Sequence, residues 1–337
     1  MTLTQEILSS LHLADKVSAW GTLGTIRPLK NFEPESDVEK ITETLDNKGN
    51  VQTIINTITG LSNDQRQEVA RLYQTELQKD LMVDIKKAVS GDLEKVLVGL
   101  LKTPAVFDAQ ELKSAMKGLG TNEATLTEIL STRSNDQLRE IQTCYRQEYK
   151  AELEKNISSD TSEPYTGLLL ALVKGKRESD SGIIDYGLIE QESKILSDLG
   201  AKNIANSTQW IKILTERSHG HLRRVFDHFR KSTSEDIEER IKRNFKGDFQ
   251  KGVLTLVAVI KDTPLYFADR LYSAVKGLGT DDSTLIRILI SRSEVDLLSI
   301  RVAYRRKYGK SLYSTIQSEA KGNYRSALLL LCRAEDI

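Results

Sequence analysis

The chain has 337 residues, of which 39% are hydrophobic and only 5 are proline, so it has room for two or three domains and is globular rather than disordered. Its 48 lysines and arginines balance 48 aspartates and glutamates, which excludes the overall basic field typical of nucleic-acid-binding proteins. The two cysteines, Cys144 and Cys332, are too few for a disulfide framework and indicate a reducing compartment.

The first twenty residues contain neither the basic segment nor the long apolar segment of a signal peptide. No apolar run approaches the roughly 18–20 residues that a membrane span requires. Any membrane contact is therefore expected to be peripheral. Residues 4–13 predict a short amphipathic helix with Ile7, Leu8 and Leu11 on its apolar stripe, which either docks into a partner's groove or packs on the protein's own core. Residues 18–34 contain two glycines and two prolines, which is typical of a linker.

The rest of the chain repeats itself. Four apolar segments, which predict buried helices, each end in a cation that suits a helix C-terminus; the cations are Lys102, Lys174, Lys261 and Arg333. Four serines in the same phase are expected to act as N-caps of amphipathic helices: Ser62, Ser134, Ser218 and Ser293. No stretch sustains the alternation of a strand. The sequence therefore predicts an all-α fold of four units with about five short helices each.

One pentapeptide, Lys-Gly-Leu-Gly-Thr, occurs twice, at residues 117–121 and again at 276–280. Two glycines around one apolar residue let the backbone turn through positive φ, which aims carbonyl oxygens at one point and lifts the leucine outward. This arrangement is typical of a cation-binding loop with an apolar tip. The alternative is a helix C-cap followed by a threonine N-cap of the next helix.

The repeated units, the two Lys-Gly-Leu-Gly-Thr loops, Arg292-Ser293 and the joints at 102–104 and 262–264 resemble the annexin family over residues 30–337. The resemblance implies a slightly curved disc, with calcium loops on its convex face and the N-terminal tail on its concave face. It divides the chain into a tail, 1–29, and four repeats: 30–104, 105–180, 181–262 and 263–337.

Calcium prefers six to eight hard oxygen ligands, often with a bidentate carboxylate. The resemblance implies that these are backbone carbonyls of the loop and one acidic side chain between the fourth and fifth helices of the same repeat. In repeat two these residues are Met116, Gly118, Gly120 and Asp160. In repeat four they are Val275, Gly277, Gly279 and Glu319. Four neighbouring side chains are expected to contact lipid: Lys117, Leu119, Lys276 and Leu278.

Repeats one and three have degenerate loops. Repeat one is one residue shorter and lacks a glycine, with Glu94 expected at the carboxylate position, and repeat three lacks the Gly-X-Gly-Thr turn, with Gln250 expected there. A neutral amide supplies one oxygen and no charge. We therefore expect strong calcium sites only in repeats two and four.

These observations favour calcium-dependent peripheral binding to anionic phospholipid at the cytosolic face of membranes, with Ca²⁺ as the cofactor. The alternative is a protein-interaction scaffold with reduced calcium dependence. The resemblance also implies that the tail helix could bind an S100-type EF-hand dimer. An enzyme is disfavoured, because the histidines at 219, 221 and 228 have no serine or cysteine partner motif; His-X-His as a transition-metal site is the minor alternative to ordinary surface residues.

Overall fold

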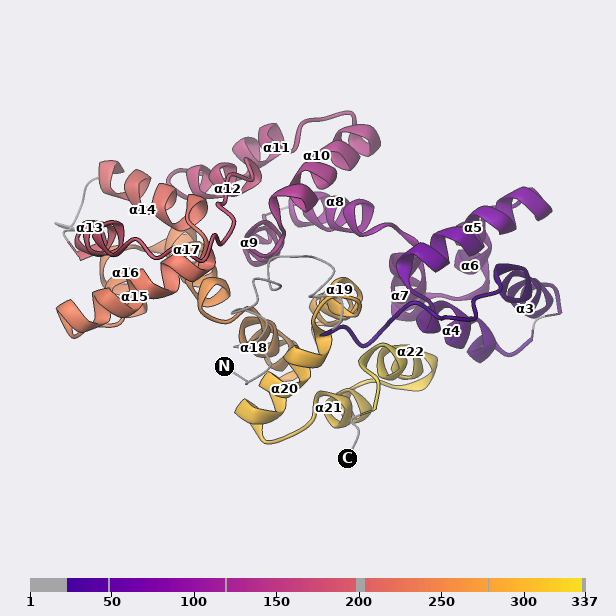
Figure 1. Ribbon diagram of the computed structural model, residues 1–337. Helices are drawn as coiled ribbons and strands as arrows, with labels where there is room; N and C mark the ends of the chain where they lie inside the picture. The colour runs from indigo at the N-terminus through magenta and orange to yellow at the C-terminus, as the bar shows by residue number, and fades with distance from the viewer. Residues whose placement is uncertain (1–22, 48, 119, 198–203, 278, 335–337) are drawn as a thin grey trace. The chain divides into compact units, whose positions relative to one another are not determined.

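The computed structural model describes residues 23–47, 49–118, 120–197, 204–277 and 279–334 (Figure 1). Within these ranges the chain forms twenty α-helices and no β-strand, which confirms the all-α prediction. The helices fall into four sets of five, one set for each repeat.

The five helices of each repeat follow the same order, with a short fourth helix before an apolar fifth one. Repeat one contains α3 (Pro34–Asp46), α4 (Val51–Gly60), α5 (Asn63–Leu77), α6 (Leu81–Ala88) and α7 (Gly91–Leu101). Repeat two contains α8 (Pro104–Ala115), α9 (Glu123–Thr132), α10 (Asn135–Tyr149), α11 (Leu153–Asp160) and α12 (Tyr165–Val173). Repeat three contains α13 (Tyr186–Ser197), α14 (Ile204–Glu216), α15 (His219–Thr233), α16 (Ile237–Asn244) and α17 (Gly247–Lys261). Repeat four contains α18 (Thr263–Val275), α19 (Asp282–Arg292), α20 (Leu297–Tyr308), α21 (Leu312–Glu319) and α22 (Gly322–Cys332).

The helices pack into two compact units. Unit 1 comprises residues 1–107 and 267–337, and unit 2 comprises residues 108–266. In unit 1, α22 of the last repeat packs against α4 and α7 of the first repeat. In unit 2, α17 of repeat three packs against α9 and α12 of repeat two. Unit 1 therefore joins the two ends of the chain, whereas unit 2 is continuous in sequence.

The fifth helix of each repeat lies in the core of its unit, as their apolar composition predicts. In α7 the residues from Val96 to Leu101 are all buried, and in α17 Val253, Leu256 and Val257 are fully covered. Burial of each such side chain stabilises the fold by about 1.5–3 kcal/mol relative to leaving it in water. These helices form the cores of the two units, and the loops of the candidate site connect the first and second helices of repeats two and four.

Three of the four predicted serine caps are confirmed. Ser62 and Ser134 form capping boxes with Gln65 and Gln137, and Ser218 accepts a hydrogen bond from the backbone N–H of His221. Each cap satisfies an N–H group that the first helical turn leaves without a partner.

The prediction for Ser293 was wrong. Ser293 is fully buried at the end of α19, its hydroxyl donates to the carbonyl of Ile290, and α20 begins only at Leu297. The acid three residues later, Asp296, is held instead by two hydrogen bonds from Arg292, at 2.7 and 2.6 Å. A capping box would require this carboxylate to accept from the backbone N–H of Ser293, but it accepts from the side chain of Arg292 instead.

The described part of the predicted linker is a strap packed on unit 1. Ile26 is 1% exposed, and its N–H donates to the carbonyl of Ser293 at 3.0 Å. The Thr25 hydroxyl donates to the carbonyl of Leu331 at 2.6 Å. A Cβ on Gly24 would lie 2.6 Å from a backbone carbon of Glu294, so only glycine permits this close approach. The residues before α3 thus tie the first repeat to the last.

Candidate functional site

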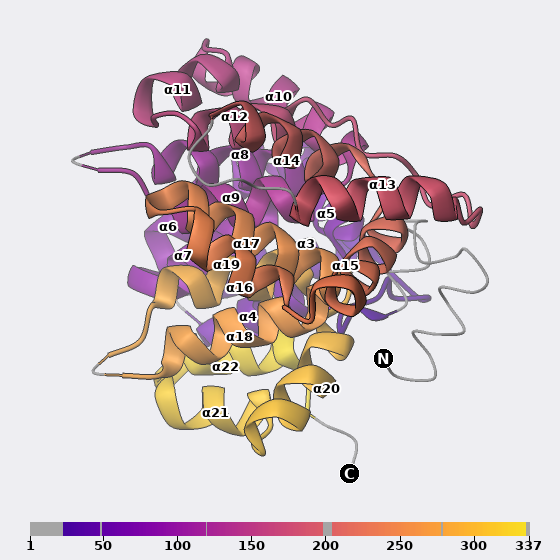
Figure 2. The same cartoon turned by 90° about the vertical axis from the view of Figure 1, so that its left-hand side faces the viewer.

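The two Lys-Gly-Leu-Gly-Thr loops connect the first and second helices of repeats two and four. Figure 2 shows each loop extending as a narrow hairpin beyond the helices that it joins, α8 and α9 in one unit and α18 and α19 in the other. All four glycines have positive φ: +103° at Gly118, +95° at Gly120, +137° at Gly277 and +98° at Gly279. A Cβ at any of them would meet no atom within 4 Å. Glycine is therefore required by the backbone conformation and not by close packing.

Both loops are closed by the same hydrogen bond. The N–H of Asn122 donates to the carbonyl of Ala115 at 2.8 Å, and the N–H of Asp281 donates to the carbonyl of Ala274 at 2.7 Å. Asn122 and Asp281 are also the N-caps of the following helices, accepting from backbone N–H groups at 3.0 and 3.1 Å. The cap is thus the residue after the threonine, and the threonine side chain is left for another contact.

The loop carbonyls of repeats two and four face no competing donor. In the described residues, no hydrogen bond ends on the carbonyl oxygens of Met116, Gly118, Gly120, Val275, Gly277 or Gly279. The four glycines are exposed, so their carbonyl oxygens are accessible to a ligand from solvent, whereas Met116 is half-buried and Val275 is buried. A buried carbonyl would need a partner within the protein, whereas an exposed one can exchange water for a cation.

The acids predicted for these sites occupy equivalent places. Asp160 is the last residue of α11 and Glu319 is the last residue of α21, and both helices are eight residues long. In repeat two the Thr121 hydroxyl donates to the backbone carbonyl of Asp160 at 3.0 Å, so loop and helix end are in direct contact. The structure thereby brings Asp160 to the loop that contains Gly118 and Gly120. The Thr121 contact was not predicted from the sequence.

A buried tyrosine lies beside each carboxylate. Burial raises the pKa of Tyr145, and the charge of Asp160 raises it further, against the effect of a hydrogen bond with Asn156. Burial likewise raises the pKa of Tyr304, with a smaller contribution from Glu319. Both phenols therefore stay neutral at physiological pH. The acids at the two helix ends are the groups that carry negative charge there.

The donor set fits calcium. Three backbone carbonyls and one carboxylate are hard oxygen ligands of the type that Ca²⁺ prefers, and the open glycine turns leave room for the water or lipid oxygens that would complete six to eight ligands. In the described part of the chain, no group of three histidine, cysteine or acidic side chains is arranged to hold a metal. This is expected of a site that relies mostly on backbone oxygens.

The structure corrects the residues expected in the degenerate repeats. All four fourth helices are eight residues long, so the positions equivalent to Asp160 and Glu319 are Ala88, at the end of α6, and Asn244, at the end of α16. Glu94 lies instead in the first turn of α7. Counting along the chain from the loops failed because the loops differ in length, whereas counting from the start of each fourth helix would have found the correct residues.

Gln250 likewise lies inside α17, where its side-chain amide donates to the carbonyl of Lys242 at 3.0 Å. Repeat three lacks the acid, as expected, whereas repeat one also lacks it, contrary to the expectation for Glu94, because neither alanine nor asparagine carries a negative charge. Repeat one also has the shortest connection, four residues between Asp46 and Val51.

The candidate lipid contacts are only partly covered by the structure. Lys117 and Lys276 are exposed beside their glycines, and the Lys276 ammonium lies 5.4 Å from the centre of the Tyr272 ring. Leu119 and Leu278 lie outside the described residues. So do the tail residues Ile7, Leu8 and Leu11.

The histidines of α15 do not form a metal site. The His219 side chain is half-buried, with its Nε2 enclosed and without a hydrogen-bond partner among the described residues, and desolvation, with the charges of Arg177 and Arg223, holds its pKa well below the usual value. His221 bonds through Nε2 to Glu192 at 2.8 Å. The two imidazoles of the His-X-His sequence therefore have different neighbours, which does not support a transition-metal ion bound by both.

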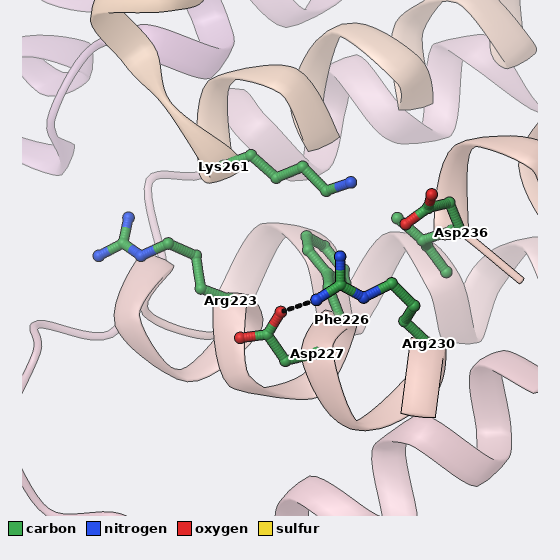
Figure 3. A pocket seen from close by; sticks show the side chains of 7 residues that line it. Arg223, Phe226, Asp227, Arg230, Asp236 and Lys261 are labelled. Atoms are coloured by element: carbon green, nitrogen blue, oxygen red, sulfur yellow. Dashed lines mark ion pairs between the residues drawn. The ribbon is translucent and has the colours of Figure 1, made fainter. Parts of the chain in front are cut away.

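A pocket of about 280 Å³ lies between α15, α16 and the end of α17 (Figure 3). Phe226 is part of its lining, together with charged side chains of both signs. Arg230 pairs with Asp227 at 3.7 Å, and Lys261 pairs with Glu238, which lies outside the lining, at 2.5 Å. These pairs involve two of the three cations of the lining; the third, Arg223, donates to the carbonyl of Ile260 at 3.1 Å, and Asp236 adds a further acid, so the pocket carries charges of both signs. It contains none of the predicted calcium ligands.

None of the described helices combines the length and the apolar character that crossing a bilayer would demand.

Comparison with known proteins agrees with this geometry. The annexin family model matches residues 36–100, 107–172, 202–256 and 266–331. Annexin A9 of Mus musculus and annexin A9 of Homo sapiens are each 45% identical over 337 residues, covering 100% of this chain and 97% of theirs. Among solved structures, annexin III has a TM-score of 0.89 at 39% identity, over 93% of this chain and 98% of that chain. Calcium-bound annexin (Sm)1 has a TM-score of 0.82 at 30% identity, over 92% and 93%.

Proposed function

Because this chain belongs to the annexin family, a family known for calcium-dependent phospholipid binding, we propose that it binds Ca²⁺ in repeats two and four and thereby attaches to anionic phospholipid at the cytosolic face of membranes. Annexins are in general membrane-binding proteins rather than enzymes, and we assign no catalytic residue. The observation that supports the proposal is the pairing of an open glycine loop with an acid at the end of the fourth helix, in these two repeats and not in repeats one and three.

The charge balance of each site favours a lipid as an additional ligand. One carboxylate, from Asp160 or Glu319, faces a dication, so about one positive charge remains uncompensated. A phosphate oxygen of an anionic lipid would replace a water ligand and neutralise that charge. Metal and membrane then strengthen each other's binding by the same factor, as thermodynamic linkage requires. Calcium affinity is expected to be modest in solution and much higher on vesicles.

The residues around the loops would add to the contact. Lys117 and Lys276 are each expected to contribute about 1 kcal/mol toward an anionic surface. Leu119 and Leu278 would enter the interfacial layer, since the glycines on either side turn the backbone around them. These contacts depend on the loop and not on the carboxylate.

The test is co-sedimentation of the full chain with phosphatidylserine-containing vesicles, in calcium and in chelator. Asp160→Ala and Glu319→Ala are each expected to weaken calcium-dependent binding, and the double variant to abolish it. The matched control is Glu154→Ala, which removes an acid from the same helix, α11, away from its end. Undiminished calcium-dependent binding by the double variant would show that the metal is bound elsewhere.

The tail carries a second, separable proposal. The apolar stripe of Ile7, Leu8 and Leu11 would bind an S100-type EF-hand dimer as a helix in a groove. Anisotropy of a labelled peptide of residues 1–13, titrated with such dimers and checked by competition with the full chain, tests it. A Kd below about 10 μM, roughly −7 kcal/mol, would support the proposal. Absence of binding by every dimer would leave the tail helix as a segment that packs on its own protein.

The scaffold alternative is favoured by one observation, the loss of the acid in two of four repeats. It predicts that vesicle binding is weak and that chelator changes it little. The same co-sedimentation experiment therefore separates the two functions.

A further inference from the structure

The fourth helices end in two chemically different ways. α11 and α21 end in the acids Asp160 and Glu319 and have no basic residue in the last turn. α6 and α16 end in neutral residues and carry two cations each in the last turn: Lys86 and Lys87 in α6, and Lys242 and Arg243 in α16. In α6 and α16, whose last residue is not an acid, the residue directly before it is a cation, Lys87 or Arg243.

The difference reverses the charge of the whole helix. In α6 two lysines outweigh one aspartate, and in α16 three cations outweigh two glutamates, so each helix carries a formal charge of +1. In α11 two acids outweigh one lysine, and in α21 one acid stands alone, so each carries −1. The chain as a whole has a net charge of zero. The two negative helices belong to the repeats with a Lys-Gly-Leu-Gly-Thr loop, and the two positive helices belong to the repeats without one.

The cations at the ends of α6 and α16 are accessible. The side chains of Lys87 and Arg243 are 71% and 61% exposed, although each contacts an acid, Asp84 at 2.8 Å and Glu235 at 2.9 Å. Exposed pairs of this kind are weak and exchange readily for another anion. Lys86 and Lys242 are exposed, and no ion pair to another described residue involves them.

Repeat one also offers space at this position. A cavity of about 550 Å³ lies between the α3–α4 connection and α6, with the buried Ile54 and Tyr73 in its lining. Its charged side chains are Lys79 and Lys87 and the two acids that they contact, Asp46 at 3.9 Å and Asp84 at 2.8 Å. Its size is within the range of pockets that bind small organic groups.

We propose that the ends of α6 and α16 bind the phosphate groups of an anionic membrane directly, without a metal. Repeats one and three would then contribute a calcium-independent, salt-sensitive part of membrane affinity beside the calcium-dependent part of repeats two and four. Each cation near the surface is expected to contribute about fivefold in affinity, and salt screens this contribution. The inference rests on the proposed membrane function and deepens it.

The experiment measures partition of the full chain onto phosphatidylcholine vesicles with and without phosphatidylserine, in chelator. It is run at ionic strengths of about 10 mM and 150 mM, where the Debye lengths are about 30 and 8 Å. We expect binding to the anionic vesicles at low ionic strength, and a loss of several hundredfold in a variant with four changes: Lys86→Gln, Lys87→Gln, Lys242→Gln and Arg243→Gln. The control variant makes four equal charge changes at exposed positions that do not end a fourth helix: Arg71→Gln, Lys231→Gln, Arg306→Gln and Lys310→Gln.

The outcomes separate the two proposals. If the wild type fails to bind anionic vesicles in chelator at low ionic strength but binds them in calcium, this inference is wrong and the calcium proposal stands. If both four-residue variants lose binding equally, net charge rather than the helix ends is responsible, which also overturns the inference. Failure to bind in calcium would contradict the proposed function itself. The pair Lys86→Gln and Lys242→Gln, which leaves the ion pairs of Lys87 and Arg243 intact, should give a smaller loss of about 25-fold and guards against misfolding.

Discussion

The hydroxyl of Thr121 donates a hydrogen bond to the backbone carbonyl of Asp160 at 3.0 Å. This bond crosses from the loop between the first two helices of repeat two to the end of its fourth helix. It holds in one place the two parts of the chain that would supply carbonyl and carboxylate ligands. Among the described residues of the loop, a further bond closes its base, from the N–H of Asn122 to the carbonyl of Ala115.

We therefore expect Thr121→Val to weaken calcium-dependent vesicle binding, although no threonine atom need touch the metal. Loss of one hydrogen bond costs about 0.5–1.5 kcal/mol, so the calcium concentration for half-maximal binding of repeat two should rise by about two- to tenfold. The measurement is a calcium titration of co-sedimentation in the Glu319→Ala background, where repeat two acts alone. Thr143→Val, which removes an exposed intrahelical bond in α10, is the control and should leave the midpoint unchanged.

Restoring an acid in repeat one should not restore a calcium site. Ala88→Asp places a carboxylate at the end of α6, but the connection from Asp46 to Val51 is only four residues and lacks a glycine with positive φ among its described residues. Calorimetric titration on anionic vesicles should give the same calcium stoichiometry for the variant as for wild type. Glu94→Ala should also leave the calcium stoichiometry unchanged, because Glu94 lies in the first turn of α7 and not at the end of α6. An additional bound ion in the Ala88→Asp variant would show that the carboxylate alone is limiting.

The strap before α3 should contribute strongly to stability. Ile26 is 1% exposed, and Ile26→Ala is expected to lower the free energy of unfolding of unit 1 by about 2–4 kcal/mol. The comparison is Leu29→Ala, a change of similar size in the same segment at a side chain that is 49% exposed, which should cost less than about 1 kcal/mol. Urea unfolding, followed by limited proteolysis to assign the transition to unit 1, measures both. Equal losses would mean that the strap is not packed in solution.

Stability should fall in mild acid through His219. The pKa of this histidine is lowered by desolvation and by Arg177 and Arg223, so the unfolded chain takes up a proton that the folded chain excludes. The stabilising contribution is present above the ordinary histidine pKa of about 6.5 and is lost as pH falls below it, by at most about 1.4 kcal/mol per pH unit.

His219→Gln should make the decline of the unfolding free energy between pH 6.5 and 5 shallower by about one proton. Ser218→Ala, which removes the neighbouring N-cap, should lower stability by about 1 kcal/mol at every pH without changing that slope. An unchanged slope in His219→Gln would place the acid sensitivity elsewhere.

The sequence was sufficient for the features that depend on local chemistry. The glycine pairs followed by threonine predicted the loops, the serines predicted the helix caps, and the apolar segments that end in a cation predicted the core. The structure confirms these predictions at Gly118, Ser62 and Val96. Features that depend on distant contacts were missed. Ser293 failed as a cap because Arg292 holds Asp296, and residues 24–26 pack on Ser293 and Leu331, almost three hundred residues away.

The candidate site shows the same division. The acids of repeats two and four were predicted from the family pattern and lie at equivalent helix ends, but Glu94 and Gln250 were misplaced because loop lengths differ between repeats. The constant quantity is the eight-residue fourth helix, which fixes Ala88, Asp160, Asn244 and Glu319 as equivalent. The Thr121 bond to Asp160 could not be predicted, since it depends on the distance between two elements about forty residues apart.

The division of the chain into units has a consequence for the order of folding. Unit 2 is one continuous segment, 108–266, so all of its contacts can form while the polypeptide is still being synthesised. Unit 1 joins residues 1–107 to 267–337, and α4 and α7 find their partner α22 only when the last residues have left the ribosome. Closing so long a loop is slow compared with local helix packing. The faces of α4 and α7 that pack on α22 therefore lack this partner until residues 322–332 have been made, and the first repeat stays incompletely packed through most of translation.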